Sequence, residues 1–330
     1  LCILGAHTSH KLLKQLSRLG NLDELRFRAR QYIHLWCDRH RLRLPVMNLI
    51  SMSLPTGFDV QERSRCHEKL NRQIFELEDK AQRIMQGKVY IFGAACRFDG
   101  RFLWKEDFIH GVTAQEGFWS DVQYLDAASV GDSKVIWELN RLQFLLPVAK
   151  VFFLTGDSSY YDWLKKTIKD WDEANPYPMG INWASSLELA FRVVVLDWVI
   201  RFLESALQED EEFRYLLLQL LAIHGRHINR YLSTYFSPNT HLSGEALGLY
   251  LLGTRYPSLP SAGKWREVGR KILLECLEMH VLPDGGYYER SLWYHRYTIE
   301  IYLLFAFLAE EALDPLPGAV REKLGSLLDF

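Results

Sequence analysis

The chain has 330 residues, of which 48% are hydrophobic and 24% are charged, enough for a large core in one or two domains. Its 39 basic and 41 acidic side chains leave a net charge of −2, so no general positive field would attract nucleic acid or an anionic membrane. We therefore expect neither partner, and no apolar run approaches the ~18 residues of a membrane span. An acidic substrate would have to be held by a local site.

The cysteines and the first residues say little about the compartment. The chain opens Leu-Cys-Ile-Leu-Gly-Ala, which could be the stub of a processed leader or of a cloned fragment. The cysteines are odd in number and lack paired metal spacing, so we interpret them as buried or incidental thiols. They are Cys2, Cys37, Cys66, Cys96 and Cys276.

The first 86 residues predict a helical lead-in domain. An amphipathic piece (residues 11–18) and a basic stretch (26–43) precede a charged, periodic helix over 61–86. Residues 87–93 are bounded by glycines and predict a strand, for which residues 97–104 would be the hairpin partner. The following segment, 111–131, predicts irregular structure.

Helices dominate after residue 131, in a domain expected to span 87–330. The apolar spacing of 133–154 predicts one amphipathic helix kinked at Pro147, and 160–173 predicts its partner. Ser185-Ser-Leu-Glu188 matches a capping box that would open a helix reaching residue 203. Further helices are predicted over 211–233, 242–252, 265–281, 292–312 and 320–328.

Several of these helices are apolar over more than one stripe, as residues 193–200 illustrate. Such helices are buried on several sides, as in the inner ring of an α/α toroid. The loops between them are of moderate length and contain Pro or Gly, which predicts antiparallel neighbours. We therefore expect a mainly all-α fold, an incomplete (α/α) toroid of antiparallel helical hairpins with a short N-terminal strand pair.

Two segments carry the residue types of a possible active site. In Ser237-Pro-Asn239-Thr-His241, an amide and an imidazole lie where a loop enters a helix. In the segment Asp284 to His295, Tyr294 follows a glycine turn that enters the next helix. Together such groups can offset the charge of an anion, accept a proton and donate a proton. Amide, imidazole and phenol groups suit these roles.

The two segments resemble the catalytic face of the heparinase II/III-like polysaccharide lyases. The resemblance continues through residues 137–143, 175–176 and 180–192, and spans roughly 85–310. It implies β-elimination in a uronic-acid-containing polysaccharide, sulfated or unsulfated. Asn239 would neutralise the carboxylate and Tyr294 would protonate the departing oxygen, while His241 or Tyr294 would be the base. The resemblance also suggests a periplasmic or secreted protein.

The same resemblance suggests which residues contact substrate. Arginine is the natural clamp for a carboxylate or sulfate, and several polar side chains could line the cleft. The candidates are Arg141, Gln143, Asn182, Trp183, Glu188, Arg192, Glu245, Glu289 and His295. We expect Asn182, Trp183, Asn239, His241, Tyr294 and His295 to converge on one concave surface.

Lyases of this kind usually carry a C-terminal β-sandwich, which this chain lacks, and we expect that domain to be missing in cis. Where the family has a metal site, it lies in that domain, so neither metal nor cofactor is expected here. His224 and His227 have a possible metal spacing but no third ligand.

Each candidate also has a structural interpretation. Asn239 could simply cap a helix, His241 could be an ordinary first-turn histidine, and Tyr294 could be a core residue. Glu188 and Arg192 could form an i, i+4 helix pair.

Two other functions stay open. A glycoside hydrolase would use two carboxylates; the candidates are Glu188, Glu245, Asp284 and Glu289. A non-catalytic polysaccharide-binding fragment is the other alternative. The polymer is open among heparan sulfate, alginate, hyaluronan and a bacterial exopolysaccharide.

Overall fold

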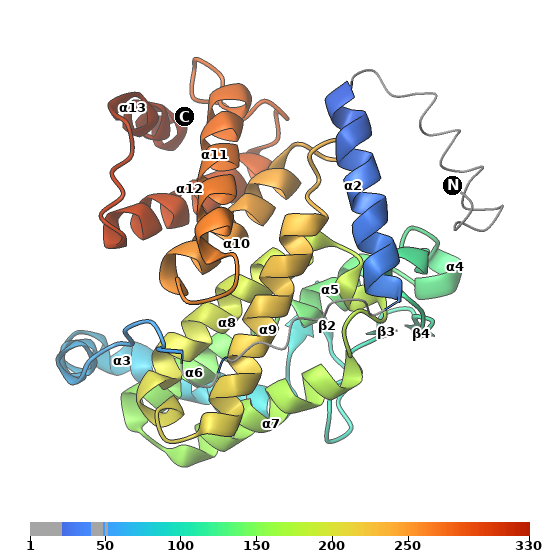
Figure 1. The fold of residues 1–330 in the computed structure, drawn as a ribbon. Helices are drawn as coiled ribbons and strands as arrows, with labels where there is room; N and C mark the ends of the chain where they lie inside the picture. Colours follow the sequence, from blue (N-terminus) through green and yellow to red (C-terminus); the bar gives the residue numbers. More distant parts are fainter. Residues whose placement is uncertain (1–21, 41–48, 50–51) are drawn as a thin grey trace. The chain divides into compact units, whose positions relative to one another are not determined.

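The computed structural model describes residues 22–40, 49 and 52–330 (Figure 1). The chain forms two compact units, Leu1–Val46 and Met47–Phe330. The described helix of the smaller unit is α2 (Leu22–Arg39). The amphipathic piece predicted at 11–18 lies outside the described residues.

The larger unit begins with the charged helix α3 (Val60–Met85), as predicted. A capping box starts it, because the Asp59 carboxylate accepts from the Glu62 N–H at 2.7 Å and Glu62 accepts from the Asp59 N–H at 2.7 Å. This helix packs against α6 (Leu145–Thr155). It therefore belongs to the larger unit, although the sequence pattern had placed it in the lead-in.

Two short antiparallel ribbons follow α3. Strand β1 (Tyr90–Ile91) pairs with β2 (Ala94–Ala95), and β3 (Glu106–Asp107) pairs with β4 (Val112–Thr113). Strand β1 lies within the predicted strand 87–93, but its partner β2 is closer in sequence than the predicted partner, 97–104. Phe92 and Gly93 both have positive φ, 50° and 81°, which suits a two-residue hairpin turn. Residues 97–104 contribute only the isolated bridge between Phe98 and Phe102.

The helix predicted over 133–154 is two helices, α5 (Ser133–Asn140) and α6. The break falls at Leu142, whose φ is 62°, a conformation that ends an α-helix. Pro147 lies in the first turn of α6, where its missing N–H breaks no helical hydrogen bond. The predicted proline kink is therefore wrong, and the break turns Arg141 toward α8.

The remaining helices confirm the predicted all-α class, with ends that shift by a few residues. They are η1 (Trp119–Asp121), α4 (Ala127–Val130), α7 (Ser158–Ala174), η2 (Ile181–Trp183), α8 (Ser186–Leu207), α9 (Glu211–Arg230), α10 (Thr240–Arg255), α11 (Ala262–His280), α12 (Leu292–Glu311) and α13 (Gly318–Asp329). Figure 1 shows these helices stacked along the larger unit.

Helices α8, α10 and α12 run in the same direction. A side chain added at Gly244 in the first turns of α10 would meet Leu187 of α8, and one added at Gly248 would meet Ala190. Further along α10, the Tyr250 ring lies 5.0 Å from that of Phe305 in α12. The hairpin partners α9 and α11 return on the outside, so the first turns of the inner helices share one end of the unit.

Glycine allows α10 and α11 to pack with their backbones in close approach. A Cβ at Gly269 of α11 would lie 2.5 Å from the carbonyl oxygen of Ala246, and a Cβ at Gly253 would lie 2.4 Å from the Arg266 nitrogen. This close packing joins the middle and the end of α10 to α11.

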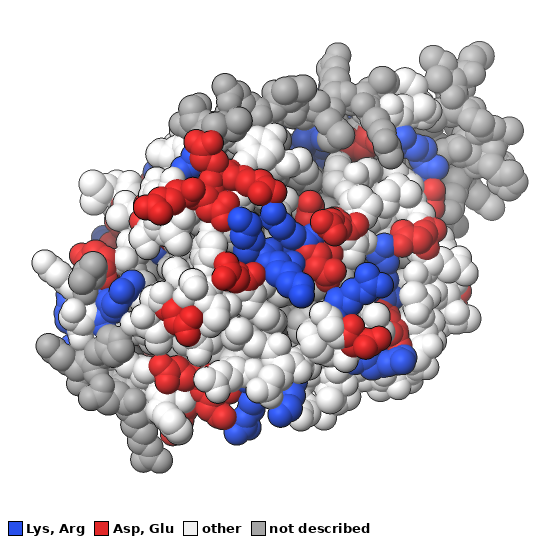
Figure 2. Space-filling model, turned by 90° about the horizontal axis from the view of Figure 1, so that it is seen from below, with Lys and Arg blue, Asp and Glu red and all other residues white. Residues whose placement is uncertain are grey.

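Charges of both signs are interspersed on the surface. On the face shown in Figure 2, lysine and arginine side chains lie among aspartate and glutamate side chains. This agrees with the net charge of −2 and leaves any recognition of anions to local features.

Candidate active site at the start of the inner helices

An arginine fork joins the end of α5 to the first turn of α8. Nε and Nη2 of Arg141 donate to the two carboxylate oxygens of Glu188 at 2.6 and 3.0 Å, and Nη1 donates to Glu138 at 2.7 Å. The guanidinium also lies over the Phe191 ring, 4.5 Å from its centroid. Burial opposes the charge of Arg141, but the two glutamates raise its pKa.

The pairing of Glu188 with Arg141 replaces two interactions that were predicted for Glu188. The Ser185 side chain makes no capping bond, so the capping box is not formed, although Ser185 is the N-cap residue. The predicted helix pair with Arg192 is also wrong. Glu188 is buried, and its carboxylate is engaged by a residue 47 positions earlier in the chain.

Asn239 and His241 begin α10. The side-chain oxygen of Asn239 accepts from the His241 N–H at 3.1 Å, so the residue is the N-cap. Its Nδ2 donates to Oε1 of Glu289 at 3.2 Å, which shows that the amide already faces a carboxylate. Burial lowers the pKa of His241, while the nearby carboxylates of Glu188 and Glu289 oppose that shift.

Glu289 follows the glycine turn that leads into α12. In that turn the Asp284 carboxylate accepts from the Gly286 N–H at 3.0 Å, and Gly285 has a φ of 87°. The buried phenol of Tyr287 lies beside Glu289, and burial together with that carboxylate raises its pKa. The Glu289 carboxylate thus accepts from the Asn239 amide through Oε1, while its buried Oε2 has no hydrogen-bond partner among the described residues.

Two tyrosines of α12 lie at this end of the unit. Tyr294 is in the first turn, with its side chain 45% exposed, and its N–H donates to the N-cap hydroxyl of Ser291 at 3.4 Å. Because α12 runs parallel to α10, Tyr294 lies at the same end as Asn239. This arrangement is required if the two residues are to act together.

Tyr297, one turn further along, points inward and was not among the residues predicted from the sequence. Its ring meets Phe191 edge-on at 5.6 Å, and its hydroxyl lies 4.0 Å from where a Cβ of Gly244 would be. Burial raises the pKa of Tyr297, against the influence of Arg141. Its i, i+3 spacing from Tyr294 was the available signal, but the inward face of α12 could not be identified without its neighbours.

Three predicted substrate contacts are wrong because their side chains are buried: Asn182, Trp183 and Arg192 are at most 1% exposed. The Asn182 amide donates to the Trp104 carbonyl at 3.0 Å, and the Trp183 indole donates to the Asn175 carbonyl at 3.0 Å. They therefore stabilise the loop before α8 from inside and cannot line a cleft.

Arg192 is held by neutral groups. It donates to the carbonyl oxygens of Asn140 at 2.7 Å and Asn182 at 3.3 Å, and its Nη1 lies 3.0 Å from Nε2 of His224. Burial lowers the pKa of Arg192 to about 9. Since Nδ1 of His224 bonds the Leu220 carbonyl at 2.7 Å, both imidazole nitrogens are occupied and neither can bind a metal.

Glu245 is also a buried residue rather than a substrate contact. It is 1% exposed, and its two oxygens accept from the N–H and hydroxyl of Ser233 at 2.7 and 2.6 Å. Burial raises its pKa to about 8. His295 is 8% exposed, and its ring packs against that of Phe330 at 5.0 Å. Gln143 is exposed and lines the groove that is described below.

The predicted convergence on one concave surface stays a prediction, but the positions of its members can be compared. The structure brings Asn239, His241 and Tyr294 to one end of the inner helices, and Arg141, Glu188, Glu289 and Tyr297 join them. Asn182, Trp183 and His295 do not contribute exposed groups.

Within the described ranges, no three His, Cys, Asp or Glu side chains cluster as a metal site would require. The four described cysteines are free, and burial raises the pKa of Cys96 and of Cys276 to about 12. No helix in this part of the chain is long and apolar enough to cross a membrane.

Comparison with known proteins relates the chain to heparinases. The family model described as "Heparinase II/III N-terminus" matches residues 61–315. A heparin-sulfate lyase of Bacteroides thetaiotaomicron is 29% identical over 161 residues, covering 48% of this chain and 23% of the relative. One from Bacteroides stercoris is 27% identical over 194 residues, covering 52% and 28%. The matched region thus spans about a quarter of the relatives' length.

Solved structures give the same fold. The crystal structure of heparinase III superposes with a TM-score of 0.60 at 20% identity, covering 91% of this chain and 42% of that one. Heparan sulfate lyase HepC from Pedobacter heparinus superposes with a TM-score of 0.60 at 18% identity, covering 77% and 37%. The toroid architecture is confirmed, and the chain belongs to the heparinase II/III family, whose N-terminal helical region it matches.

Proposed function

We propose that the protein is a polysaccharide lyase that cleaves a uronic-acid-containing glycosaminoglycan by β-elimination. One observation carries the proposal: the Asn239 amide faces a carboxylate, beside a half-buried imidazole, at the end of the unit where α12 presents its tyrosines. The naming of the relatives as heparin-sulfate lyases supports the substrate class.

The reaction needs the negative charge of the uronate to be offset. The C5 proton leaves, its electron pair forms the C4–C5 double bond, and the C4–O4 bond breaks as O4 takes up a proton. In this scheme Nδ2 of Asn239 donates to the substrate carboxylate as charge grows on it. The same nitrogen donates to Glu289 in the free protein, so its direction already suits an anion.

His241 and Tyr294 would transfer the protons. Because burial lowers the pKa of His241, its imidazole is neutral at pH 7 and can accept the C5 proton. Tyr294 is exposed at the same end and would protonate O4. Tyr297 keeps its own proton, since its pKa is raised, and we assign it the role of orienting the Arg141–Glu188 pair.

A glycoside hydrolase is less well supported. Of the four candidate carboxylates, Glu188 is bound by Arg141 and Glu245 is buried. Asp284 caps a turn, and Glu289 accepts from Asn239. None of them is a free carboxylate facing another across an open cleft, as hydrolysis would require.

The test introduces the Tyr294→Phe substitution into the full-length protein. The substitution keeps the ring and removes only the proton donor, so the fold should persist and turnover should fall at least ~100-fold. Formation of the unsaturated uronate is followed by its ultraviolet absorbance on a panel of heparan sulfate, hyaluronan and alginate.

Tyr215→Phe, on the outer helix α9, is the matched control and should retain the parental rate. Unsaturated product formed by Tyr294→Phe at the parental rate would show that Tyr294 is not the acid. New reducing ends without ultraviolet absorbance would indicate a hydrolase. Binding of the polymers without cleavage would indicate a binding protein.

A further inference from the structure

The candidate active site alone is poorly suited to attract a polyanion. Its described guanidinium, Arg141, is already paired with the carboxylates of Glu138 and Glu188, and Glu289 adds a third carboxylate. A substrate with a negative charge on each repeat would find no unpaired cation among these four groups. Attraction must therefore come from cations elsewhere along the path of the polymer.

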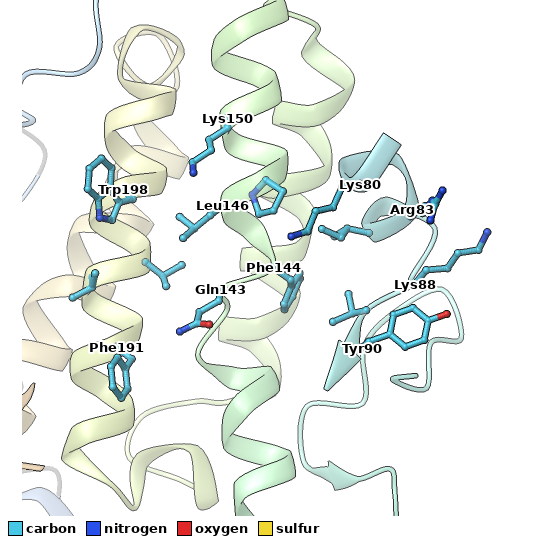
Figure 3. A pocket seen from close by; sticks show the side chains of 15 residues that line it. Lys80, Arg83, Lys88, Tyr90, Gln143, Phe144, Leu146, Lys150, Phe191 and Trp198 are labelled. Atoms are coloured by element: carbon cyan, nitrogen blue, oxygen red, sulfur yellow. The ribbon is translucent and has the colours of Figure 1, made fainter. Parts of the chain in front are cut away.

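A groove with the required charge lies beside this site, between α3, β1, α6 and α8 (Figure 3). It has a volume of about 720 Å³, and four cations line it: Lys80, Arg83, Lys88 and Lys150. No aspartate or glutamate is among its described lining residues. Figure 3 shows Lys80 and Lys150 reaching into the space between the helices, whereas Arg83 and Lys88 extend at the outer rim.

The lysines of the groove are not neutralised by carboxylates. Arg83 pairs with Asp79 at 2.8 Å, but Lys80, Lys88 and Lys150 form no ion pair within the described residues. These three ammonium groups therefore line one concave surface without a described carboxylate to balance them. Their grouping over an otherwise mixed-charge surface points to a binding function.

The floor of the groove is apolar and partly aromatic. Phe144, Pro147, Phe191 and Trp198 line it, with Val195 buried beneath. Flat rings cover the apolar faces of sugars, while cations at the edge bind their charged substituents. The groove thus combines the two chemistries that a charged oligosaccharide presents.

The groove and the candidate active site share the ring of Phe191. Phe191 lines the groove, and the same ring lies under the Arg141 guanidinium and against Tyr297. Gln143 also lines the groove, two residues beyond Arg141. A chain bound at Asn239 could therefore extend past Phe191 toward Lys80 and Lys150.

We propose that this groove is an anion subsite that binds the sulfo or carboxylate groups of the glycosaminoglycan several sugars away from the bond that is cleaved. Lys80 and Lys150 make the main contacts, and Lys88 adds a weaker one at the rim. The identity of the polymer rests on the proposed function, whereas binding of an acidic oligosaccharide in the groove can be tested without turnover.

The test compares two double variants of the whole protein. Lys80→Gln with Lys150→Gln removes the two inward charges. Lys134→Gln with Lys264→Gln removes two exposed charges of α5 and α11 as the matched control. The probe is a heparin octasaccharide, and its dissociation constant is measured by calorimetry at several salt concentrations.

We expect the groove variant to bind the octasaccharide roughly tenfold more weakly, with a flatter salt dependence, while the control binds as the parent does. A fully desulfated, N-acetylated octasaccharide separates the sources of charge. If sulfo groups occupy the groove, the groove and control variants bind the desulfated octasaccharide equally. If carboxylates occupy it, the groove variant binds both octasaccharides more weakly than the control does. Equal binding of the heparin octasaccharide by both variants would overturn the proposal.

Acetylation of lysines in the parental protein gives a test without substitution. The octasaccharide should protect Lys80 and Lys150 but not Lys134 or Lys264. If Lys80 and Lys150 do not react even without the octasaccharide, another part of the protein covers the groove. That result would refute the subsite. If the octasaccharide protects Lys80 and Lys150 but no unsaturated product forms, the lyase function is refuted and the subsite stands. If unsaturated product forms but the two lysines are not protected, the subsite is refuted and the lyase function stands.

Discussion

Replacing Glu245 with glutamine should remove a pH-dependent loss of stability that the carboxyl group causes. The side chain is 1% exposed in α10, and its only described partners are the N–H and hydroxyl of Ser233. Glutamine has the same shape. Its oxygen can accept from the Ser233 N–H, and its amide can donate to the Ser233 hydroxyl after that proton rotates.

The size of the effect follows from the pKa. Burial raises the pKa of Glu245 from 4.5 to about 8, so the folded state holds the proton more tightly than the unfolded state. The resulting stabilisation is complete below about pH 4.5 and is lost as the pH rises through about 8. The free energy of unfolding should fall by about 1.4 kcal/mol per pH unit in this window, or about 5 kcal/mol in all.

The assay is the thermal midpoint of parent and Glu245→Gln between pH 5 and pH 9, because the difference between them isolates this group. The two midpoints should be similar near pH 5, and the variant should become progressively more stable as the pH rises. A constant difference across the range would mean that Glu245 is ionised in the folded protein, and the reasoning from burial would fail.

Two further substitutions test the site and the packing behind it. Glu188→Gln loses the bidentate pair with Arg141 and should lower turnover about tenfold or more, a loss in kcat that a purely structural role would not produce. Parental kcat with a lowered thermal midpoint would show that the pair is structural. Gly269→Ala should destabilise the protein by about 2 kcal/mol or more, because its Cβ would lie 2.5 Å from backbone of α10. Gly263→Ala in the same helix meets no atom within 4 Å and should leave the midpoint unchanged in a thermal melt; equal losses would contradict the packing argument.

Much of the helical framework could be predicted because its signals are local. Apolar periodicity and breaker residues located α3 and the helices from α7 to α13 to within a few residues. The single long helix over 133–154 was wrong because the positive φ of Leu142 ends α5. Nothing in the local apolar pattern indicated a break there, and the proline that was expected to kink the helix lies in the first turn of the next one.

The sequence predicted the local role of a candidate residue where the residue type alone determines that role. Asn239 caps α10 as its position after Ser-Pro suggested, and the same residue carries the amide that the lyase mechanism needs. The polar types of Asn182 and Arg192 suggested a surface, but their hydrogen bonds to neighbouring carbonyls allow both to be buried. Such compensation depends on partners far away in the chain.

By itself, the sequence determined which segments are helical, which residues start α10 and α12, and which family the motifs resemble, because spacing along one helix is a local property. Only the tertiary structure decided that Glu188 pairs with Arg141 and that Tyr297 points inward. It also decided that the lysines of α3 and α6 line one groove. These relations depend on how each helix is rotated about its axis when it packs, and that rotation is settled by the fit of all the neighbouring side chains together.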